Sequence, residues 1–224
     1  MGPNYQFQFA QVFDNFGLLV GGLWTTFGVA ADSFVLACVL GFVAAQLRLS
    51  RRASLRRLAT AYVDFFRTTP FLVQLVWIFY CVPLVFRISL DTIQSAILAL
   101  GLYYGANLAE VFRAGVASLA RGQTEAGLAL GMSGLQMARR VIYPQAIRRV
   151  LPPLGSSTVS LVKDTSITSV IGVPELMNAA QNLQLQLFRP LEVLTVAAIM
   201  YLIATYPIAW IADTLHRRYA SEVM

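Results

Sequence analysis

Long apolar runs, separated by short arginine-rich intervals, dominate this sequence. The first run, residues 17–47, carries a single charged residue, Asp32, and is longer than the roughly 20 residues that a helix needs to cross a bilayer. Further apolar runs lie at about residues 58–86, 92–112, 154–171 and 192–215. Because a chain in lipid must pair its backbone polar groups internally, these runs predict an all-α integral membrane protein with five transmembrane helices.

Composition and the placement of charge argue against a soluble protein and against a nucleic-acid-binding one. Of the 224 residues, 57% are hydrophobic and 12% are charged, whereas an average soluble domain has about 25% charged residues. The formal charge of +6 comes almost entirely from arginines beside the apolar runs, and such arginines mark the cytoplasmic side of membrane proteins. We therefore expect contact with membrane lipid and no nucleic-acid partner.

The distribution of basic residues predicts the topology. Five basic residues follow the first run, six lie in the interval 113–152 and two end the last run, against only Arg87 and Arg189 in the predicted external loops. This asymmetry places the N-terminus outside and the C-terminus inside. The start of the chain has no basic residue, so the first run should be an uncleaved anchor. We expect an external or interfacial segment at residues 1–16, one transmembrane domain at 17–217 and a cytoplasmic tail at 218–224.

The interval 113–152 is the one long polar stretch between apolar runs, with six arginines and a single carboxylate, Glu125. Residues 123–132 are rich in Ala, Leu, Glu and Gln, which predicts a short helix. This helix should end near Gly131, because glycine readily adopts the left-handed conformation that ends many helices.

A second helix is predicted directly after this break. Ser133 can cap its start, with Gln136 three residues later as the reciprocal partner of a capping box. The helix should extend to about Arg149 and bend at Pro144, which cannot donate a backbone hydrogen bond. The two helices predict a compact cytoplasmic knob, and an amphipathic pair lying on the lipid surface is the alternative interpretation.

The knob resembles the cytoplasmic EAA loop of bacterial ATP-binding-cassette (ABC) importer permeases. The family pattern is E-A-A, three residues, G, nine residues and then I-x-L-P, and the spacing here agrees throughout. The matching residues are Glu125-Ala126-Gly127, Gly131 and Val141-Ile142-Tyr143-Pro144. Gly127, Val141 and Tyr143 depart from the pattern, and the latter two keep apolar bulk. The resemblance implies contact with an ATPase subunit through Gln123, Glu125, Ala126, Gly127, Gly131 and Pro144, the first five in an inserted coupling helix.

Other segments, spread over about residues 64–183, are similar to the polar amino-acid permease family. They are 66–74 (FRTTPFLVQ), 104–115 (YGANLAEVFRAG), 122–123 (GQ), 161–166 (LVKDTS) and 172–176 (GVPEL). The resemblance implies the five-span fold of a type I ABC importer in the bacterial inner membrane. It also implies a second permease subunit, itself or a homologue, two ATPase subunits and an extracytoplasmic binding protein that delivers an amino acid.

Polar residues inside the predicted spans suggest where cargo binds. Arg67 and Lys163 each lie about ten residues from a cytoplasmic boundary, or about 15 Å at the helical rise, where an unpaired charge is costly. We expect three clusters to converge on one cavity that binds a zwitterion through carboxylate-binding cations and ammonium-binding carboxylates. These clusters are Asp64 with Arg67, Asn107 with Glu110, and Lys163 with Asp164, Thr165 and Ser166. In the alternative interpretation, these charges pair only to hold the bundle together.

No enzyme activity is predicted for the chain itself. Lys163, the sole lysine, lies outside any G-x-x-x-x-G-K-[ST] loop, so we expect ATP and Mg²⁺ to bind a partner ATPase and no cofactor to bind here. Cys38, Cys81 and His216 show no metal-type spacing. The sequence also lacks H-E-x-x-H and G-x-S-x-G, which disfavours an intramembrane enzyme. An ion channel, or another transporter without ATP coupling, is the alternative to an amino-acid importer, and the residues do not separate Gln, Glu, Arg and His as cargo.

Overall fold

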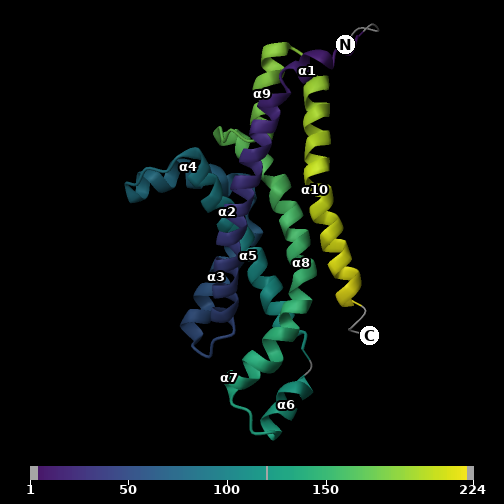
Figure 1. The fold of residues 1–224 in the computed structure, drawn as a ribbon. Coiled ribbons are helices and arrows are strands. Elements are labelled where there is room, and N and C mark those ends of the chain that lie inside the picture. Colours follow the sequence, from purple (N-terminus) through teal and green to yellow (C-terminus); the bar gives the residue numbers. More distant parts are fainter. Residues whose placement is uncertain (1–4, 120, 221–224) are drawn as a thin grey trace.

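The computed structural model describes residues 5–119 and 121–220, and every regular element in these ranges is a helix (Figure 1). The α-helices are α1 (Ala10–Asp14), α2 (Phe16–Arg48), α3 (Ala53–Thr68), α4 (Phe71–Phe86), α5 (Thr92–Ala117), α6 (Arg121–Ala129), α7 (Gly134–Met137), α8 (Tyr143–Asp164), α9 (Leu176–Leu187) and α10 (Pro190–Ala220). A π-helical turn, η1 (Ala138–Ile142), precedes α8, and a 3-10 helix, η2 (Thr165–Ile171), follows it.

The helices form a long bundle with different structures at its two ends. In Figure 1, α2, α5, α8 and α10 run along the bundle, α6 and α7 project from one end, and α1 and α9 lie at the other. Within the described residues, α2, α5 and α10 are each long and apolar enough to cross a membrane. We call the end with α6 and α7 the knob end and the opposite one the α9 end.

The second apolar run is broken in the middle. The kink that proline predicts there is confirmed as a bend of 110° between α3 and α4, so α4 extends sideways from the bundle (Figure 1). Pro70 has no N–H to offer the carbonyl of Phe66. The Gln74 side chain replaces this missing donor. Its Nε2 donates to the Phe66 carbonyl at 3.0 Å and to the Thr69 carbonyl at 3.1 Å. A buried amide thus stabilises the break.

Small residues allow α2 and α5 to pack closely. A Cβ added at Gly41 would lie 2.9 Å from the Gly105 carbonyl oxygen and 2.9 Å from the Leu108 Cβ, so the two backbones nearly touch. Small residues spaced four apart are typical of such contacts between membrane helices. They recur on both helices: Ala37, Gly41 and Ala45 on α2, and Gly101, Gly105 and Ala109 on α5.

The fourth apolar run is regular only in part. α8 packs on α10 through Gly155, where an added Cβ would lie 2.5 Å from the Ala212 Cβ. After Asp164 the chain tightens into the seven residues of η2, and Gly172, with φ of 82°, then turns it into α9. Glu175, fully buried, caps α9 and accepts a hydrogen bond from the Tyr201 hydroxyl of α10 at 2.5 Å.

Candidate functional site

A polar cavity of about 420 Å³ lies between α5 and α8. We call it the polar cavity, and its walls carry hydroxyls, an amide, one cation and one anion. The lining residues are Tyr103, Tyr104, Asn107, Ser156, Ser157, Ser160, Lys163 and Asp164. On each helix these residues recur three or four positions apart, which places them on one face.

Hydrogen bonds orient part of this lining. The Tyr104 hydroxyl, from a side chain only 5% exposed, donates to Asp164 Oδ2 at 2.7 Å and joins α5 to α8. The Asn107 Nδ2 donates one hydrogen bond to the Tyr103 carbonyl at 2.9 Å, which leaves its amide oxygen and its second N–H for a ligand. Ser157 donates to the Pro153 carbonyl at 2.9 Å and keeps its oxygen as an acceptor. The cavity therefore offers the Lys163 ammonium as its cation and the Asp164 carboxylate as its anion.

Two of the other predicted charges, Arg67 and Glu110, line a second cavity of about 670 Å³, nearer the knob end, which we call the arginine cavity. The carboxylate oxygens of Glu110 lie 2.6 Å from Arg48 of α2, 3.4 Å from Arg67 of α3 and 2.8 Å from Arg113 of α5. One carboxylate therefore joins three helices. Arg149 of α8 also lines this cavity and donates a hydrogen bond to the Ser118 carbonyl.

The three clusters expected from sequence thus do not meet in one cavity, and their members line the polar cavity, the arginine cavity or neither of them. Arg67 pairs with Glu110, while Asp64 is exposed and no ion pair joins it to Arg67 in the part of the chain that the structure describes. The physical reason is the bend after Thr68, because α3 ends there and leaves Arg67 beside the end of α2. Thr165 and Ser166 hydrogen-bond to the carbonyls of Val162 and Lys163, and they line neither cavity.

Five residues of the polar cavity were absent from the predicted cargo site: Tyr103, Tyr104, Ser156, Ser157 and Ser160. Helical spacing could have found the serines, since Ser160 precedes Asp164 by four residues and Ser156 precedes it by eight. The tyrosines carried no such signal, because an aromatic pair in an apolar run is usually part of a core.

The knob has the predicted helix and break, but the helix after the break is longer than predicted. It passes through α7, the π-helical turn η1 and α8 to Asp164 and does not end near Arg149, since Pro152 and Pro153 lie inside α8. Gly131 has φ of 72°, which confirms the left-handed end of α6, and the capping box of Ser133 and Gln136 is formed with both of its hydrogen bonds. Gly127 packs against the buried Met137, since an added Cβ would lie 2.5 Å from the Met137 Cε. The glycine that departs from the EAA pattern therefore admits a side chain of the next helix.

The other predicted coupling residues lie on the outside of the knob. Glu125 and Ala126 are exposed on α6, and Pro144 is exposed at the second position of α8, directly after the π-helical turn η1. The side chain of Gln123 lies outside the described part of the structure. Three leucines of the knob are unusually exposed for their size: Leu128 (61%), Leu130 (81%) and Leu135 (70%). Exposed apolar side chains on a charged projection are typical of a protein contact surface.

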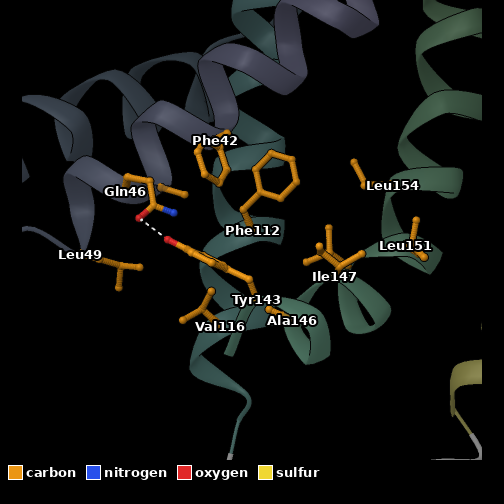
Figure 2. Close-up of a pocket in the computed structure, with 12 residues that line it drawn as sticks. Phe42, Gln46, Leu49, Phe112, Val116, Tyr143, Ala146, Ile147, Leu151 and Leu154 are labelled. Atoms are coloured by element: carbon orange, nitrogen blue, oxygen red, sulfur yellow. Dashed lines mark hydrogen bonds between the residues drawn. The ribbon is translucent and has the colours of Figure 1, made fainter. Parts of the chain in front are cut away.

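The knob joins the bundle at a small apolar cavity between α2, α5 and α8 (Figure 2). Tyr143, the first residue of α8, stands where the EAA pattern has leucine. Its ring extends toward α2, and its hydroxyl donates to the Gln46 Oε1 at 3.4 Å. The aromatic side chain thus keeps apolar contact and adds a polar link to the end of α2.

These features define a class of protein. Membrane-length helices, a polar cavity between two of them and a helical projection at one end are typical of a transport subunit.

The chain belongs to the family of binding-protein-dependent transport system inner membrane components, which matches residues 37–221. It is therefore a multi-pass protein of the inner membrane. It is 37% identical to the L-cystine transport system permease protein TcyB of Bacillus subtilis (strain 168), over 90% of this chain and 86% of that protein. It is 34% identical to the glutamine transport system permease protein GlnP of Escherichia coli (strain K12), over 95% of this chain and 98% of that protein.

Solved structures agree on the fold. A chain of an amino acid ABC transporter crystallised with histidines superimposes with a TM-score of 0.89 at 29% identity, over 96% of this chain and all of that one. A chain of the inward-facing MetNI methionine ABC transporter, only 22% identical, shows the same fold with a TM-score of 0.78, over 92% of this chain and 98% of that one. The fold is that of a type I ABC importer transmembrane domain.

Proposed function

We propose that this chain is the permease subunit of an ABC importer that carries a polar or charged amino acid across the inner membrane. In this proposal an extracytoplasmic binding protein delivers the cargo at the α9 end, and ATP is hydrolysed by a separate subunit at the knob end. The names of the two relatives described above, cystine and glutamine permeases, support this class of cargo. The observation that carries the proposal is the presence of one cation and one anion in a single polar cavity.

A free amino acid carries an ammonium and a carboxylate on the same carbon, so its binding site needs an opposite charge for each. Lys163 would bind the α-carboxylate and Asp164 the α-ammonium. Tyr104 holds the Asp164 carboxylate in place, while the Asn107 amide oxygen and the serine hydroxyls would bind polar atoms of the cargo side chain. A lipid-facing surface would not retain this set of groups, because each costs free energy when it is desolvated without a partner.

Coupling to ATP hydrolysis is assigned to the knob. The charge distribution of the sequence puts the knob in the cytoplasm, and the exposed leucines there provide apolar contact area for an ATPase subunit. Gln123, Glu125, Ala126, Gly127 and Gly131 lie in or end α6, the inserted coupling helix of this proposal, and Pro144 lies at the start of α8 behind it. Movement of the knob reaches the polar cavity directly, because α8 begins in one and ends in the other.

The test uses the permease purified with its ATPase and binding protein and reconstituted in proteoliposomes. We expect Lys163→Gln and Asp164→Asn to raise the cargo concentration for half-maximal ATP-driven uptake by about 10-fold to 100-fold, as the loss of a charge-assisted contact predicts. Asp213→Asn, which alters an exposed carboxylate on α10, is the matched control and should leave uptake unchanged. Unchanged concentration dependence in both cavity variants, at normal yield of the complex, would show that the cargo binds elsewhere.

A further inference from the structure

The arginine cavity contains more positive charge than its single carboxylate can balance. Glu110 accepts hydrogen bonds from Arg48 and Arg113 and forms an ion pair with Arg67, and Arg149 adds a fourth guanidinium, which donates to the neutral carbonyl of Ser118. Arg67 and Arg113 keep 43% and 40% of their side-chain surface exposed, so each has N–H groups that Glu110 leaves unbound. A planar guanidinium with free donors beside an open cavity is suited to a carboxylate, which it can bind through two parallel hydrogen bonds.

The arginine cavity and the polar cavity lie in the same groove between α5 and α8. On α5, Asn107 lines the polar cavity and Val111 the arginine cavity, four residues or about 6 Å farther along the helix. On α8, Ser157 lines the first and Pro153 the second, again four residues apart. A small molecule that leaves Lys163 toward the knob end therefore passes Arg113 and Arg149.

We propose that the arginine cavity is a second, cytoplasm-facing binding station, in which Arg67 and Arg113 bind the α-carboxylate of the cargo after it leaves the polar cavity. This inference rests on the function proposed above. The excess of arginines serves release, because the carboxylate exchanges one cation for another instead of crossing the inner half of the membrane unpaired. Glu110 holds the arginines in position and, as an anion itself, keeps the station from binding the carboxylate too tightly.

The test places a single reporter cysteine in each cavity of the complete purified complex, after Cys38 and Cys81 are replaced by alanine. Ala114→Cys reports on the arginine cavity and Ser157→Cys on the polar cavity. Labelling rates are measured with an anionic methanethiosulfonate (2-sulfonatoethyl) and a cationic one (2-trimethylammonioethyl). L-glutamine, L-glutamate, L-arginine, L-histidine and L-cystine are first screened for uptake, and a transported amino acid then serves as the protecting ligand, beside its α-amide and inorganic phosphate.

We expect Ala114→Cys to react faster with the anionic reagent than with the cationic one. The amino acid should slow this reaction by a factor of about 1 + [L]/Kd, roughly tenfold at ten times the dissociation constant. The α-amide, which has no carboxylate, should protect weakly. Arg113→Gln should abolish protection at Ala114→Cys and leave protection at Ser157→Cys intact, which separates loss of the station from loss of folding.

The pattern of protection at the two reporter cysteines distinguishes failure of the second station from failure of the proposed function. Protection at Ser157→Cys without protection at Ala114→Cys overturns the second station and leaves the proposed function standing. Absence of protection at both positions overturns the proposed cargo cavity as well. Equal protection by inorganic phosphate and by the amino acid shows an anion site with no preference for cargo, and this also overturns the station.

Discussion

Gly131 ends α6 with φ of 72°, and a Cβ added there would meet no neighbouring atom within 4 Å. Space is therefore available for a larger side chain, and the backbone conformation is what excludes it. Gly131→Val should cost about 1–2 kcal/mol in the knob, because an L side chain is strained in the left-handed region. We expect the variant to reach the membrane and assemble but to lose ATP-driven uptake.

Uptake by this variant is measured in vesicles, with permease quantity determined by immunoblot. Gly134→Ala is the control within the same knob, because Gly134 begins α7 with a negative φ and has free space around it. Normal uptake by Gly131→Val would show that coupling does not need the left-handed end of α6.

A second prediction for a single residue concerns the contribution of Glu110 to stability. Glu110→Gln removes the charge that joins Arg48, Arg67 and Arg113, and leaves the arginines to repel one another. The carboxylate is 20% exposed, so solvent moderates the loss, and we expect about 1–3 kcal/mol of destabilisation. Thermal unfolding of the purified complex measures it.

Asp64→Asn is the comparison, since Asp64 is exposed on the same helix as Arg67. It should change stability by less than about 0.5 kcal/mol, as is usual for a surface substitution. If the two variants unfold at the same temperature, the arginine cluster does not contribute to the stability of the bundle.

The sequence predicts individual site residues unevenly, and the contrast between two of them shows why. Asp164 was expected in a cargo cavity and lines one, because a charge in the middle of an apolar run has few alternatives. Arg67 was expected in the same cavity because of its depth in the second span, and the size of the bend at Pro70 was not part of that prediction. A bend of 110° cannot be measured in a sequence, although Pro70 shows where it occurs.

At the scale of elements, the bend between α3 and α4 depends on Gln74, which is 5% exposed. Gln74→Leu would leave the carbonyls of Phe66 and Thr69 without their donor, at a cost of about 1–3 kcal/mol for each buried group left unsatisfied. We expect lower thermal stability and a broader distribution of bend angles.

Spin labels at Leu58 and Leu84, both exposed and on opposite sides of the bend, report the angle as a distance distribution. Gln186→Leu on α9 exchanges the same residue types at an exposed position and should leave this distribution unchanged. An equally narrow distribution in Gln74→Leu would assign the bend to Pro70 alone.

Elements were predictable wherever local signals act alone. The glycine end of α6 and the capping box of α7 follow from a few neighbouring residues. The fourth apolar run is different, because the change from α8 to the 3-10 helix η2 has no local signal among its serines and threonines. Packing against α2, α4, α5 and α9 surrounds η2, and those contacts are set by the whole bundle.

At the scale of the whole molecule, the polar cavity needs a cover. Lys163 is exposed in a single chain, and an ammonium facing lipid near the bilayer centre costs about 2.5–3.5 kcal/mol on insertion scales. We therefore expect a second permease subunit to lie over α8 and η2 in a twofold arrangement. Cysteines placed one at a time along residues 156–169 should crosslink between subunits at some positions.

Val35→Cys, at a 64% exposed position of α2, gives the background rate of crosslinking for a purely apolar surface. Crosslinking no faster than this background along the whole of residues 156–169, in the intact complex, would rule out a second permease at this face.

The 3-10 helix η2 links the polar cavity to α9, and its length depends on its helix type. A 3-10 helix rises about 2.0 Å per residue and an α-helix about 1.5 Å. The seven residues of η2 are therefore roughly 3.5 Å longer along the helix axis than the same residues would be as an α-helix. Conversion to α-helix would draw α9 toward the polar cavity by that distance and rotate it by about 140°, since each residue turns about 20° less. A protein that bound α9 and favoured the α-helical form of η2 would therefore shift and rotate the segment that links α9 to Asp164.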